Sequence, residues 1–514
     1  MVTRLCVTGN CIFFYNNSLL KHPCVQCFYI ACLKNRQNTI LVVLLNSLCV
    51  SDLYALACFW HVILQKQIQG MKKIFTIIVA GCILSNAAPA QVMTMDECMQ
   101  YAVEHSITVG KQENVLDNAK MNYKQSVAAL FPSVSAGVSA STNFGRSIDP
   151  ETNNYTTVST FGNSYSLSAS MPIFAGLRYI NSIRAAKVAR DRGYSDLQIA
   201  RDRVAMEVMR FYSDVVYYKG AVAIAEEHLS ASRKMLYQAQ KLYELGRKSA
   251  AEVAEIAAQE ANYDYLLAEQ QNNLAMAWIT LREVMNYPQT SPLEVVEEGV
   301  QVVLNEELSV RDIVEHALSG NAQVVSSELA VKESKINYAR SKAVWFPTIS
   351  LSAGINTNYY TNFDNKQAYP SFSSQFKNNR GEYIALSMSI PIFSNLSRRS
   401  SVRTSRNALR NAELELSAVR NSVESEVVQA CHRMDGYGKL YNQAVKKVEA
   451  SQLAYDGIAA KFGKGLVTAI ELQSAATTLL QAKSDCLRSQ LQYMIEKRMV
   501  DYYSGIPFVI IRNE

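Results

Sequence analysis

Four segments of the chain alternate between apolar and small polar residues, a period-two pattern that predicts half-buried β-strands. Their apolar members occupy every second position within residues 134–140, 165–171, 349–355 and 384–390. Serine, glycine and alanine fill the positions between them. Each segment is about ten residues long, which matches a tilted transmembrane strand of about 9–11 residues. A soluble antiparallel sheet is the alternative, although its polar face would more often carry lysine and glutamate.

A helical pattern occupies most of the remaining chain, and no proline occurs in residues 173–287 or 392–506. Interior proline costs a helix about 3 kcal/mol, so both stretches permit very long helices. Apolar or small residues recur along each at alternating spacings of four and three, which predicts left-handed coiled-coil packing. A helix over residues 177–243 would be on the order of 100 Å long.

The two heptad stripes keep the same phase in the two halves of the chain. The first comprises Val204, Val208, Phe211, Val215, Tyr218, Val222, Ala225, Leu229, Ser232, Leu236, Ala239 and Tyr243. The second comprises Val423, Val427, Ala430, Met434, Tyr437, Tyr441, Ala444, Val448, Ser451, Tyr455, Ile458 and Phe462. Gly246 and residues 463–465 end these stripes, and glycine supplies the left-handed conformation that lets a chain reverse after a helix.

Each half therefore predicts the order helix, β-hairpin, long helix, tight turn and return helix. The segments 142–163 and 356–382, rich in Asn, Thr and Tyr, are expected to be loops between paired strands at one rim of a barrel. The repeated motifs are Phe131-Pro132 with Phe346-Pro347, and Pro172-Ile173-Phe174 with Pro391-Ile392-Phe393. Their offsets of 215 and 219 residues exceed the ~20–50 residues of solenoid repeats. They predict a duplicated domain with halves at 91–308 and 309–514.

A cleavable export signal is predicted at residues 71–90. Two lysines open it, an apolar stretch follows at residues 74–84, and small residues at 88–90 form the cleavage site. The mature chain would begin near Gln91. The protein is therefore expected to be exported.

Residues 1–70 precede this complete signal and are interpreted as an over-extended start outside the fold. The spacing of Cys24 and Cys27 leaves a metal or redox site there as the alternative. Residues 1–90 also hold the whole net charge of +6, so the exported part is neutral and shows no electrostatic footprint for nucleic acid. Three cysteines remain in the exported part, and all are expected to act as small apolar residues: Cys98, Cys431 and Cys486.

Four strands cannot close a membrane barrel by themselves, since the smallest such barrels have eight strands. An open sheet edge in lipid would leave backbone N–H and C=O groups unpaired at several kcal/mol each. Two, three or four chains would supply eight, twelve or sixteen strands. The chain is therefore expected to be an oligomer, of a size that this argument leaves open.

The duplicated proline motifs are followed by two similar glycine turns. In the first half Gly246 is followed by Glu252-Val253, and in the second half Gly465 is followed by Glu471-Leu472. In the order of these motifs, over nearly all of residues 94–507, the chain resembles the TolC-type outer-membrane efflux proteins. No single motif is specific, but their order, duplicated in register, is.

The resemblance implies an α+β membrane protein with an internal two-fold repeat. A homotrimer would form one 12-stranded β-barrel, with four strands per chain, in the outer-membrane lipid of a Gram-negative cell. The barrel would continue into a long α-helical coiled-coil tunnel in the periplasm. The implied function is the channel of a tripartite efflux or secretion system, which passively conducts substrates received from an inner-membrane pump and a periplasmic adaptor (membrane fusion) protein.

The resemblance also implies a periplasmic gate. In the family, acidic residues after the second glycine turn narrow the entrance; Glu471 matches one of them, and Ser474 stands where the next would be. Glu252 and Glu255 occupy the equivalent stretch of the first half. Three like charges converging on an axis attract cations, as a cation-sensitive constriction would. Alternatively, these glutamates are solvated charges favourably placed in a first helical turn.

Two further groups of residues receive predicted roles. The adaptor-docking tips are Gly246, Arg247, Lys464 and Gly465, with turn formation as the alternative role of the glycines. The corners between barrel and tunnel are Phe131, Pro132, Pro172, Phe174, Phe346, Pro347, Pro391 and Phe393, where proline ends regular strand pairing and the aromatic rings are expected to pack.

Enzymatic activity, a metal site and a cofactor are not expected. The histidines of the exported part are scattered, without metal-ligand spacing, and no nucleophile elbow occurs. A trimeric coiled-coil adhesin with a barrel anchor is the better alternative to a channel, because it too would join heptads to a barrel. Adhesins, however, usually carry one terminal block of strands, whereas this chain has two hairpins inside two internal repeats.

Overall fold

The computed structural model describes residues 91–148, 153–157, 159–296, 309–363 and 369–509, and four short strands near the N-terminus. The chain divides into two compact units, Met1–Pro89 and Ala90–Glu514. The first contains two antiparallel pairs: β1 (Arg4–Val7) with β2 (Asn10–Phe13), and β3 (Lys34–Asn35) with β4 (Asn38–Thr39). The predicted export signal lies outside the described residues, as does most of the segment before it.

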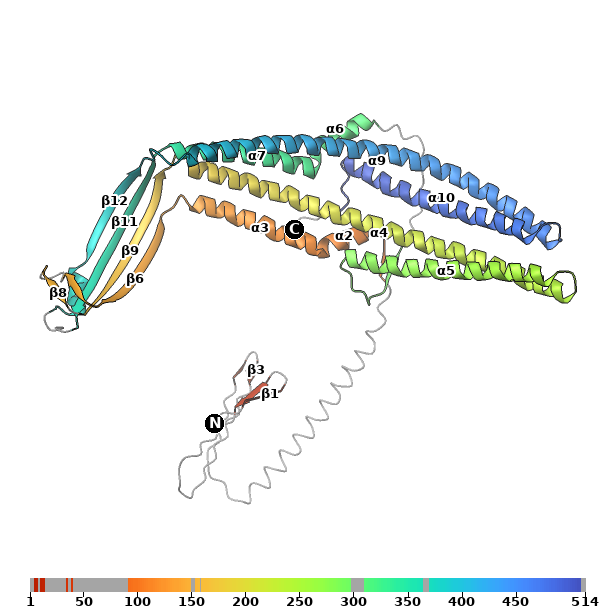
Figure 1. Cartoon of the computed structure of the whole chain (residues 1–514), viewed down its shortest axis with the longest axis horizontal. Coiled ribbons are helices and arrows are strands. Elements are labelled where there is room, and N and C mark those ends of the chain that lie inside the picture. Colours follow the sequence, from red (N-terminus) through yellow and green to blue (C-terminus); the bar gives the residue numbers. More distant parts are fainter. Residues whose placement is uncertain are drawn as a thin grey trace, which may run out of the picture. The chain divides into compact units, whose positions relative to one another are not determined.

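The second unit carries the same order of main elements in each half (Figure 1). The first half contains β5 (Gln91–Met93), α2 (Met95–His105), α3 (Ile107–Ala128), β6 (Ser133–Asn143), β7 (Arg146–Ile148), β8 (Tyr155–Thr157), β9 (Thr160–Phe174), α4 (Arg178–Glu244), α5 (Ala250–Val284) and β10 (Leu293–Val295). The second half contains α6 (Val310–Gly320), α7 (Ala322–Lys342), η1 (Ala343–Trp345), β11 (Thr348–Asn362), α8 (Phe372–Asn378), β12 (Gly381–Ser389), α9 (Ser397–Gly463) and α10 (Ala469–Tyr503). The order that the sequence predicts is present in both halves.

The long helices pair as the heptad stripes predict. Helices α4 and α9 are both 67 residues long, and each packs along a return helix of 35 residues, α5 or α10. Val208 and Val215 of the first stripe are fully buried, as are Val427 and Ala430 of the second. Tyr243, the last member of the first stripe, is exposed. None of the helices in the described part of the chain is both long and apolar enough to cross a membrane.

The four predicted strands form one antiparallel sheet in the order β12-β11-β9-β6. Pairing between β9 and β11 joins the two hairpins. The register places Leu167 opposite Ala136 on one side and opposite Ile355 on the other, and Ala353 lies opposite Ala169 and Ile384. Directly opposed residues share a face. The apolar positions of all four strands therefore line one face, and serine and glycine line the other.

Serine hydroxyls bond to one another across the polar face. The Oγ atoms of Ser135 and Ser168 lie 3.0 Å apart, and those of Ser139 and Ser164 lie 2.7 Å apart. These cross-strand bonds satisfy the hydroxyls without long or charged side chains. The polar face is thus made mainly of small groups, as the sequence predicts, and Tyr383 near the start of β12 is a large side chain that lies over Gly354 on this face.

The sheet extends farther from the helices than the sequence predicts. β9 begins at Thr160 and β11 ends at Asn362, inside the segments 142–163 and 356–382 that were expected to be loops. These segments also contain the β7–β8 pair and α8. The loop prediction is wrong for these residues because pairing between β9 and β11 continues through polar and aromatic positions, and tertiary context overrides composition in strands.

The outer strands of the sheet leave two edges open within the chain. β6 pairs only with β9, and β12 pairs only with β11, among the strands that the structure describes. Apolar side chains beside these edges are exposed, with Val138 at 72% and Ile384 at 82% of their full accessible area. Within the described part of a single chain, both the backbone of the edges and the apolar face therefore lack a covering.

The main core of the second unit surrounds the middle of α4. Helices α2 and α3 pack against α4, next to the parallel pair of β5 and β10. Tyr212 is buried there and its hydroxyl donates to the carbonyl oxygen of Val296 at 2.6 Å. Cys98 and Cys431 are buried free thiols, as predicted, and burial raises the pKa of the Cys98 thiol to about 12. Cys486 is half-buried.

Two consecutive left-handed residues turn each hairpin into its long helix. Gly176 and Leu177 have φ of +60° and +65° before α4, and Asn395 and Leu396 have φ of +48° and +63° before α9. A left-handed conformation costs a residue with a side chain roughly 1–2 kcal/mol. A Cβ at Gly176 would also lie 2.7 Å from the Cβ of Phe346. Glycine is therefore required here for both conformation and space.

Replacing Gly176 should destabilise this junction. Gly176→Ala adds strain and a close contact, and should lower the free energy of unfolding by roughly 1–3 kcal/mol. Gly110→Ala is the matched control, because a Cβ at Gly110 in α3 meets nothing within 4 Å. Thermal unfolding of the purified protein measures both variants. Equal midpoints for the two variants would contradict this account of the junction.

Candidate functional site

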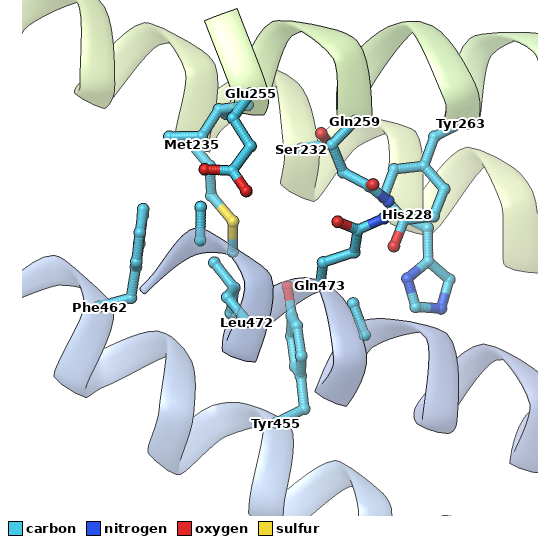
Figure 2. Close-up of a pocket in the computed structure, with 13 residues that line it drawn as sticks. His228, Ser232, Met235, Glu255, Gln259, Tyr263, Tyr455, Phe462, Leu472 and Gln473 are labelled. Atoms are coloured by element: carbon cyan, nitrogen blue, oxygen red, sulfur yellow. The ribbon is translucent and has the colours of Figure 1, made fainter. Parts of the chain in front are cut away.

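The two helical hairpins, α4–α5 and α9–α10, meet near their ends in a small apolar core. Ile256, Phe462 and Leu472 are buried there and come from both hairpins. A cavity beside them is lined from both hairpins, as Figure 2 shows. Its polar lining comprises His228, Ser232, Glu255, Gln259, Tyr263, Tyr455 and Gln473. Its space of about 40 Å³ holds a few water molecules and no larger ligand.

His228 is a buried polar group of this cavity. Its ring stacks on Tyr263 with centroids 5.6 Å apart, and its Nε2 has no hydrogen-bond partner among the described residues. Burial lowers the pKa of His228, and the nearby Lys483 ammonium lowers it further, although Glu227 acts in the opposite direction. Lys483 and Glu227 form an ion pair at 2.7 Å across the hairpins. The cavity is thus part of the hairpin interface.

The turns at residues 245–249 and 464–468, called here the first and second tips, share one geometry. Gly246 has φ of +68°; its N–H donates to the carbonyl of Tyr243 at 2.9 Å, and the Arg247 N–H donates to that of Leu242 at 2.8 Å. In the second tip, with Gly465 at φ of +73°, the corresponding bonds join Gly465 to Phe462 at 2.9 Å and Leu466 to Lys461 at 3.0 Å. This is the Schellman motif, whose left-handed position favours glycine.

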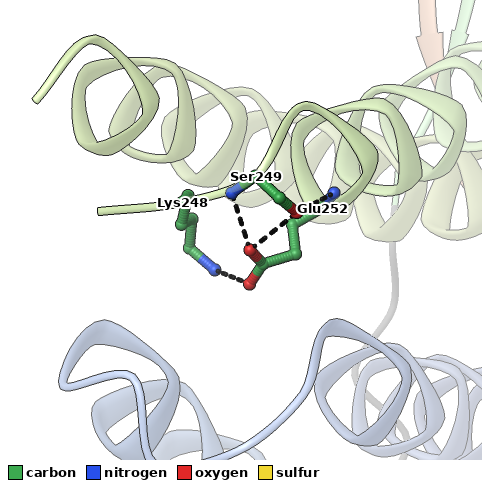
Figure 3. Close-up of polar contacts among 3 residues, drawn as sticks. All are labelled: Lys248, Ser249 and Glu252. Atoms are coloured by element: carbon green, nitrogen blue, oxygen red, sulfur yellow. Dashed lines mark hydrogen bonds and ion pairs between the residues drawn. The ribbon is translucent and has the colours of Figure 1, made fainter. Parts of the chain in front are cut away.

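Each return helix starts with a hydroxyl cap and a glutamate three residues later. Ser249 Oγ accepts from the Glu252 N–H at 3.2 Å, while the Glu252 carboxylate accepts from the Ser249 N–H at 2.8 Å and Lys248 Nζ at 3.1 Å (Figure 3). Thr468 Oγ1 accepts from the Glu471 N–H at 3.3 Å and donates to Glu471 Oε1 at 3.2 Å. The first tip therefore has a complete capping box.

The two capping glutamates differ in what their carboxylates can do. Hydrogen bonds from the backbone and hydroxyl of Ser249 and from Lys248 lower the pKa of Glu252 to about 2, with the backbone bond as the largest cause. The Glu471 carboxylate accepts from the Thr468 hydroxyl and is exposed. Glu252 is committed to holding its helix start. The Glu471 carboxylate, in contrast, remains accessible to ions in solution.

Lys248 connects the first tip to helix α9 of the second hairpin. Its Nζ lies 4.6 Å from the centroid of the Phe462 ring on α9 and forms the ion pair with Glu252. The side chain of Lys248 is only 10% exposed, and Phe462 is 7% exposed. A cation over an aromatic face contributes about 0.5–2 kcal/mol, with the larger values where water is excluded. Lys248 therefore holds the first tip against the second hairpin.

The structure brings the predicted gate and docking residues together at this end of the hairpins. Arg247, Lys464 and Glu471 are exposed, and a Cβ at Gly246 or Gly465 would meet nothing within 4 Å. Glu255 borders the cavity from α5. Packing in one chain thus leaves room for a partner at both tips.

The predicted corner residues lie at the other end of the long helices. Pro132 directly precedes β6, and Pro172 lies in β9 beside a register shift between Ile349 and Ser350. Pro391 follows β12, and its carbonyl accepts from Arg398 Nη1 at 2.7 Å. Pro347 directly precedes β11. These prolines border the regular pairing of the sheet or interrupt it, as expected.

The phenyl rings of the corners are exposed in a single chain. Their exposed fractions range from 39% to 77%, for Phe131, Phe174, Phe346 and Phe393. Contacts within a single chain therefore do not supply the packing that was expected of these rings.

At the tips of the hairpins, the structure shows two features that were not predicted from the sequence. The pattern Ser249-x-x-Glu252, with its counterpart Thr468-x-x-Glu471, is a readable capping-box signature and could have identified both helix starts. The contact between Lys248 and Phe462 has no local signal, because it depends on how the two hairpins pack.

Comparison with known proteins finds one family. The model of the family described as outer membrane efflux protein matches residues 99–287 and 313–501. Outer membrane protein TolC of Salmonella enteritidis is 23% identical over 252 residues, 48% of this chain and 50% of that protein. Outer membrane protein TolC of Escherichia coli (strain K12) is 22% identical over 347 residues, 65% of this chain and 68% of that protein. The chain thus matches about half of the first relative's length and two thirds of the second's.

Solved structures share the fold. The open-state MtrE outer membrane channel of Neisseria gonorrhoeae superposes with a TM-score of 0.65 at 16% identity, over 81% of this chain and 91% of that one. None of these similarities supports an adhesin.

Removing the charge of Glu252 should loosen the start of α5. The depressed pKa means that the carboxylate stabilises this helix start above about pH 4.5, and that the contribution is lost as the pH falls toward about 2. Glu252→Gln should therefore weaken amide protection at residues 250–256 at neutral pH. In this variant, protection should no longer fall as the pH drops from about 4.5 to about 2. Hydrogen exchange, corrected for the intrinsic effect of pH, measures both. Glu255→Gln is the control, and equal protection in the two variants would refute the cap.

Proposed function

Because the chain belongs to the outer membrane efflux protein family, we propose that it is an outer-membrane efflux channel of the TolC type and that three copies form one continuous conduit. A 12-stranded β-barrel, with four strands from each chain, crosses the outer membrane of a Gram-negative cell. The long helices continue it as a tunnel in the periplasm. The two similar halves of each chain are the product of a duplication, so three chains supply six similar units.

The observation that carries this proposal is the sheet with two open edges. Lipid cannot satisfy backbone N–H and C=O groups, so a sheet in a bilayer must close on itself. Four strands are too few to close, and pairing β12 of one copy with β6 of the next removes every edge. The number three comes from the family. The exposed apolar face then meets lipid, and the face of serine and glycine lines the barrel.

The lining favours passive conduction. Small hydroxyl side chains leave the barrel lumen open and wet, and the serine pairs Ser135–Ser168 and Ser139–Ser164 satisfy one another. Family members are channels rather than enzymes, and no step of this function requires a catalytic residue. Conduction then depends on what opens the periplasmic end.

The tunnel would bring the tips to the partners that deliver substrate. A helix of 67 residues spans about 100 Å at 1.5 Å per residue, which carries the tips far from the membrane. Gly246, Arg247, Lys464 and Gly465 present an exposed, basic surface there. An adaptor protein with helical hairpins, joined to an inner-membrane pump, would dock on this surface to complete a tripartite system.

The gate is assigned to Glu471. Its carboxylate is exposed beside the second tip, and three copies would place three such charges around the axis of the tunnel. Glu252 and Glu255 are assigned supporting roles at most, because the first is held in its capping box and the second borders the cavity. A ring of carboxylates attracts cations, so divalent cations should bind there and reduce ion conduction through the periplasmic end of the tunnel.

Neutralising Glu471 should relieve this block. Glu471→Gln keeps the length of the capping side chain but removes three charges from the assembled ring. The concentration of divalent cation that halves single-channel conductance in planar bilayers should rise about tenfold or more, which corresponds to losing at least roughly 1.4 kcal/mol of binding. Glu252→Gln, at the matching position of the other half, should leave the block unchanged. An unchanged block in the Glu471 variant would remove it from the gate.

A further inference from the structure

The segment between β11 and β12 distinguishes the second hairpin from the first. It contains the short helix α8, whereas the corresponding segment of the first half contains the β7–β8 pair. Helix α8 packs on β11. Thr357 Oγ1 donates to the carbonyl of Phe376 at 2.8 Å, and Asn379 Nδ2 donates to the carbonyl of Asn358 at 3.0 Å. The helix therefore lies along the sheet instead of projecting from it.

Helix α8 occupies the place where β12 would continue. The β11–β12 ladder reaches only to Asn356 opposite Gly381, whereas β11 continues to Asn362. Gln375, which is 5% exposed, fills the gap: its Oε1 accepts from the Tyr360 N–H at 3.0 Å, and its Nε2 donates to the Tyr360 carbonyl at 2.8 Å. The side-chain amide thus makes the two bonds that a paired strand residue would make.

Aromatic rings from α8 and the sheet form a cluster on the apolar face. Tyr165 lies opposite both Val138 and Thr357, so it shares the face of Leu167. The rings in contact with one another are Phe161, Tyr165, Tyr359, Phe372 and Phe376, with centroids 5.3 to 6.4 Å apart. Phe372 and Phe376 remain 45% and 42% exposed. The cluster continues the apolar face toward the end of the strands farthest from the helices.

The level of this cluster matches the edge of a bilayer. Counted from Ile349 at the helical end of β11, a tilted membrane strand of about 9–11 residues ends near Thr357 to Tyr359. Aromatic side chains of outer-membrane barrels concentrate at this level, where their apolar bodies and polar tips suit the boundary between lipid and water. A strand edge in water needs no side chain to pair its backbone, whereas one beside lipid does.

We propose that α8 is an interfacial anchor on the outside of the barrel, where its aromatic cluster lies in the outer lipid–water boundary and Gln375 holds it against the edge of β11. The proposal rests on the proposed channel, because it takes the apolar face as the lipid face. It assigns the membrane interface as the partner of this surface. The segment that was expected to be a solvent-exposed loop is then no lid over the channel mouth.

Tryptophan probes in the full-length trimer distinguish these positions. Phe372→Trp reports on α8, and Ile384→Trp reports on the deep apolar face of β12. Each variant is reconstituted in phosphatidylcholine vesicles whose acyl chains are brominated either near the headgroup or near the chain end, with unbrominated vesicles as the reference. The signal of the parent protein, which includes Trp278 and Trp345, is subtracted.

The anchor predicts that lipid brominated near the headgroup quenches most of the added Phe372→Trp fluorescence, and that lipid brominated near the chain end quenches most of the Ile384→Trp fluorescence. Quenching of Ile384→Trp together with a Phe372→Trp probe that only aqueous acrylamide quenches would overturn the anchor and place α8 in water. If neither lipid quenches Ile384→Trp, the apolar face does not meet lipid, and the proposed barrel itself fails.

Gln375 is tested by a second substitution. Gln375→Met keeps the size of the side chain but removes both bonds to Tyr360, so it should reduce the quenching of Phe372→Trp by headgroup-brominated lipid. Quenching of Ile384→Trp should remain, which shows that the barrel has still formed. Ser373→Ala, on the exposed side of α8, is the matched control. Unchanged quenching in the Gln375 variant would show that its amide does not hold the helix.

Discussion

The pairing of strand backbones is the constraint on which the rest of this architecture depends. Among the residues that the structure describes, β6 and β12 each have a partner on one side only, and apolar side chains on the face between them are exposed. The apolar face suits lipid, but unpaired backbone groups cost several kcal/mol each in a bilayer. Pairing these edges between copies would remove that cost and leave the apolar face to the lipid. The sheet also fixes where the long helices begin, because α4 and α9 follow β9 and β12 after short connections.

The helical part also consists of repeated units, but the two halves have diverged at their tips. At both tips the long helix ends in a Schellman motif and the return helix begins with a hydroxyl cap, so the two backbones are alike. In the first tip Lys248 and Ser249 engage Glu252 fully, and Lys248 also lies over Phe462. In the second tip Glu471 keeps an exposed carboxylate. Lys248 thereby holds the first tip against the second hairpin, whereas the Glu471 carboxylate beside the second tip remains exposed.

Most of the fold was predictable from the sequence because its determinants are local. Alternation in Ser and apolar residues located all four strands, and the proline-free heptads located both ends of α4 and the end of α9 to within a residue or two. Two kinds of feature escaped. Leu177 and Leu396 adopt left-handed conformations that their side chains do not favour, and only the glycine or asparagine before each gives a hint. Gln375 and Lys248 act through contacts with distant strands or helices, which no periodicity encodes.

Disulfide cross-linking between the two open edges tests the central claim most directly. In one chain β6 and β12 are separated by two strands, roughly 14 Å at about 4.8 Å per strand, which exceeds the reach of a disulfide. With Ser387→Cys fixed in β12, cysteine is placed in turn at the polar-face positions of β6: Ser133, Ser135, Gly137, Ser139 and Ser141. At one of these positions we expect disulfide-linked dimers and trimers, and nothing larger than a trimer, on a denaturing gel. A conducting protein that stays monomeric on the gel at every position would contradict it.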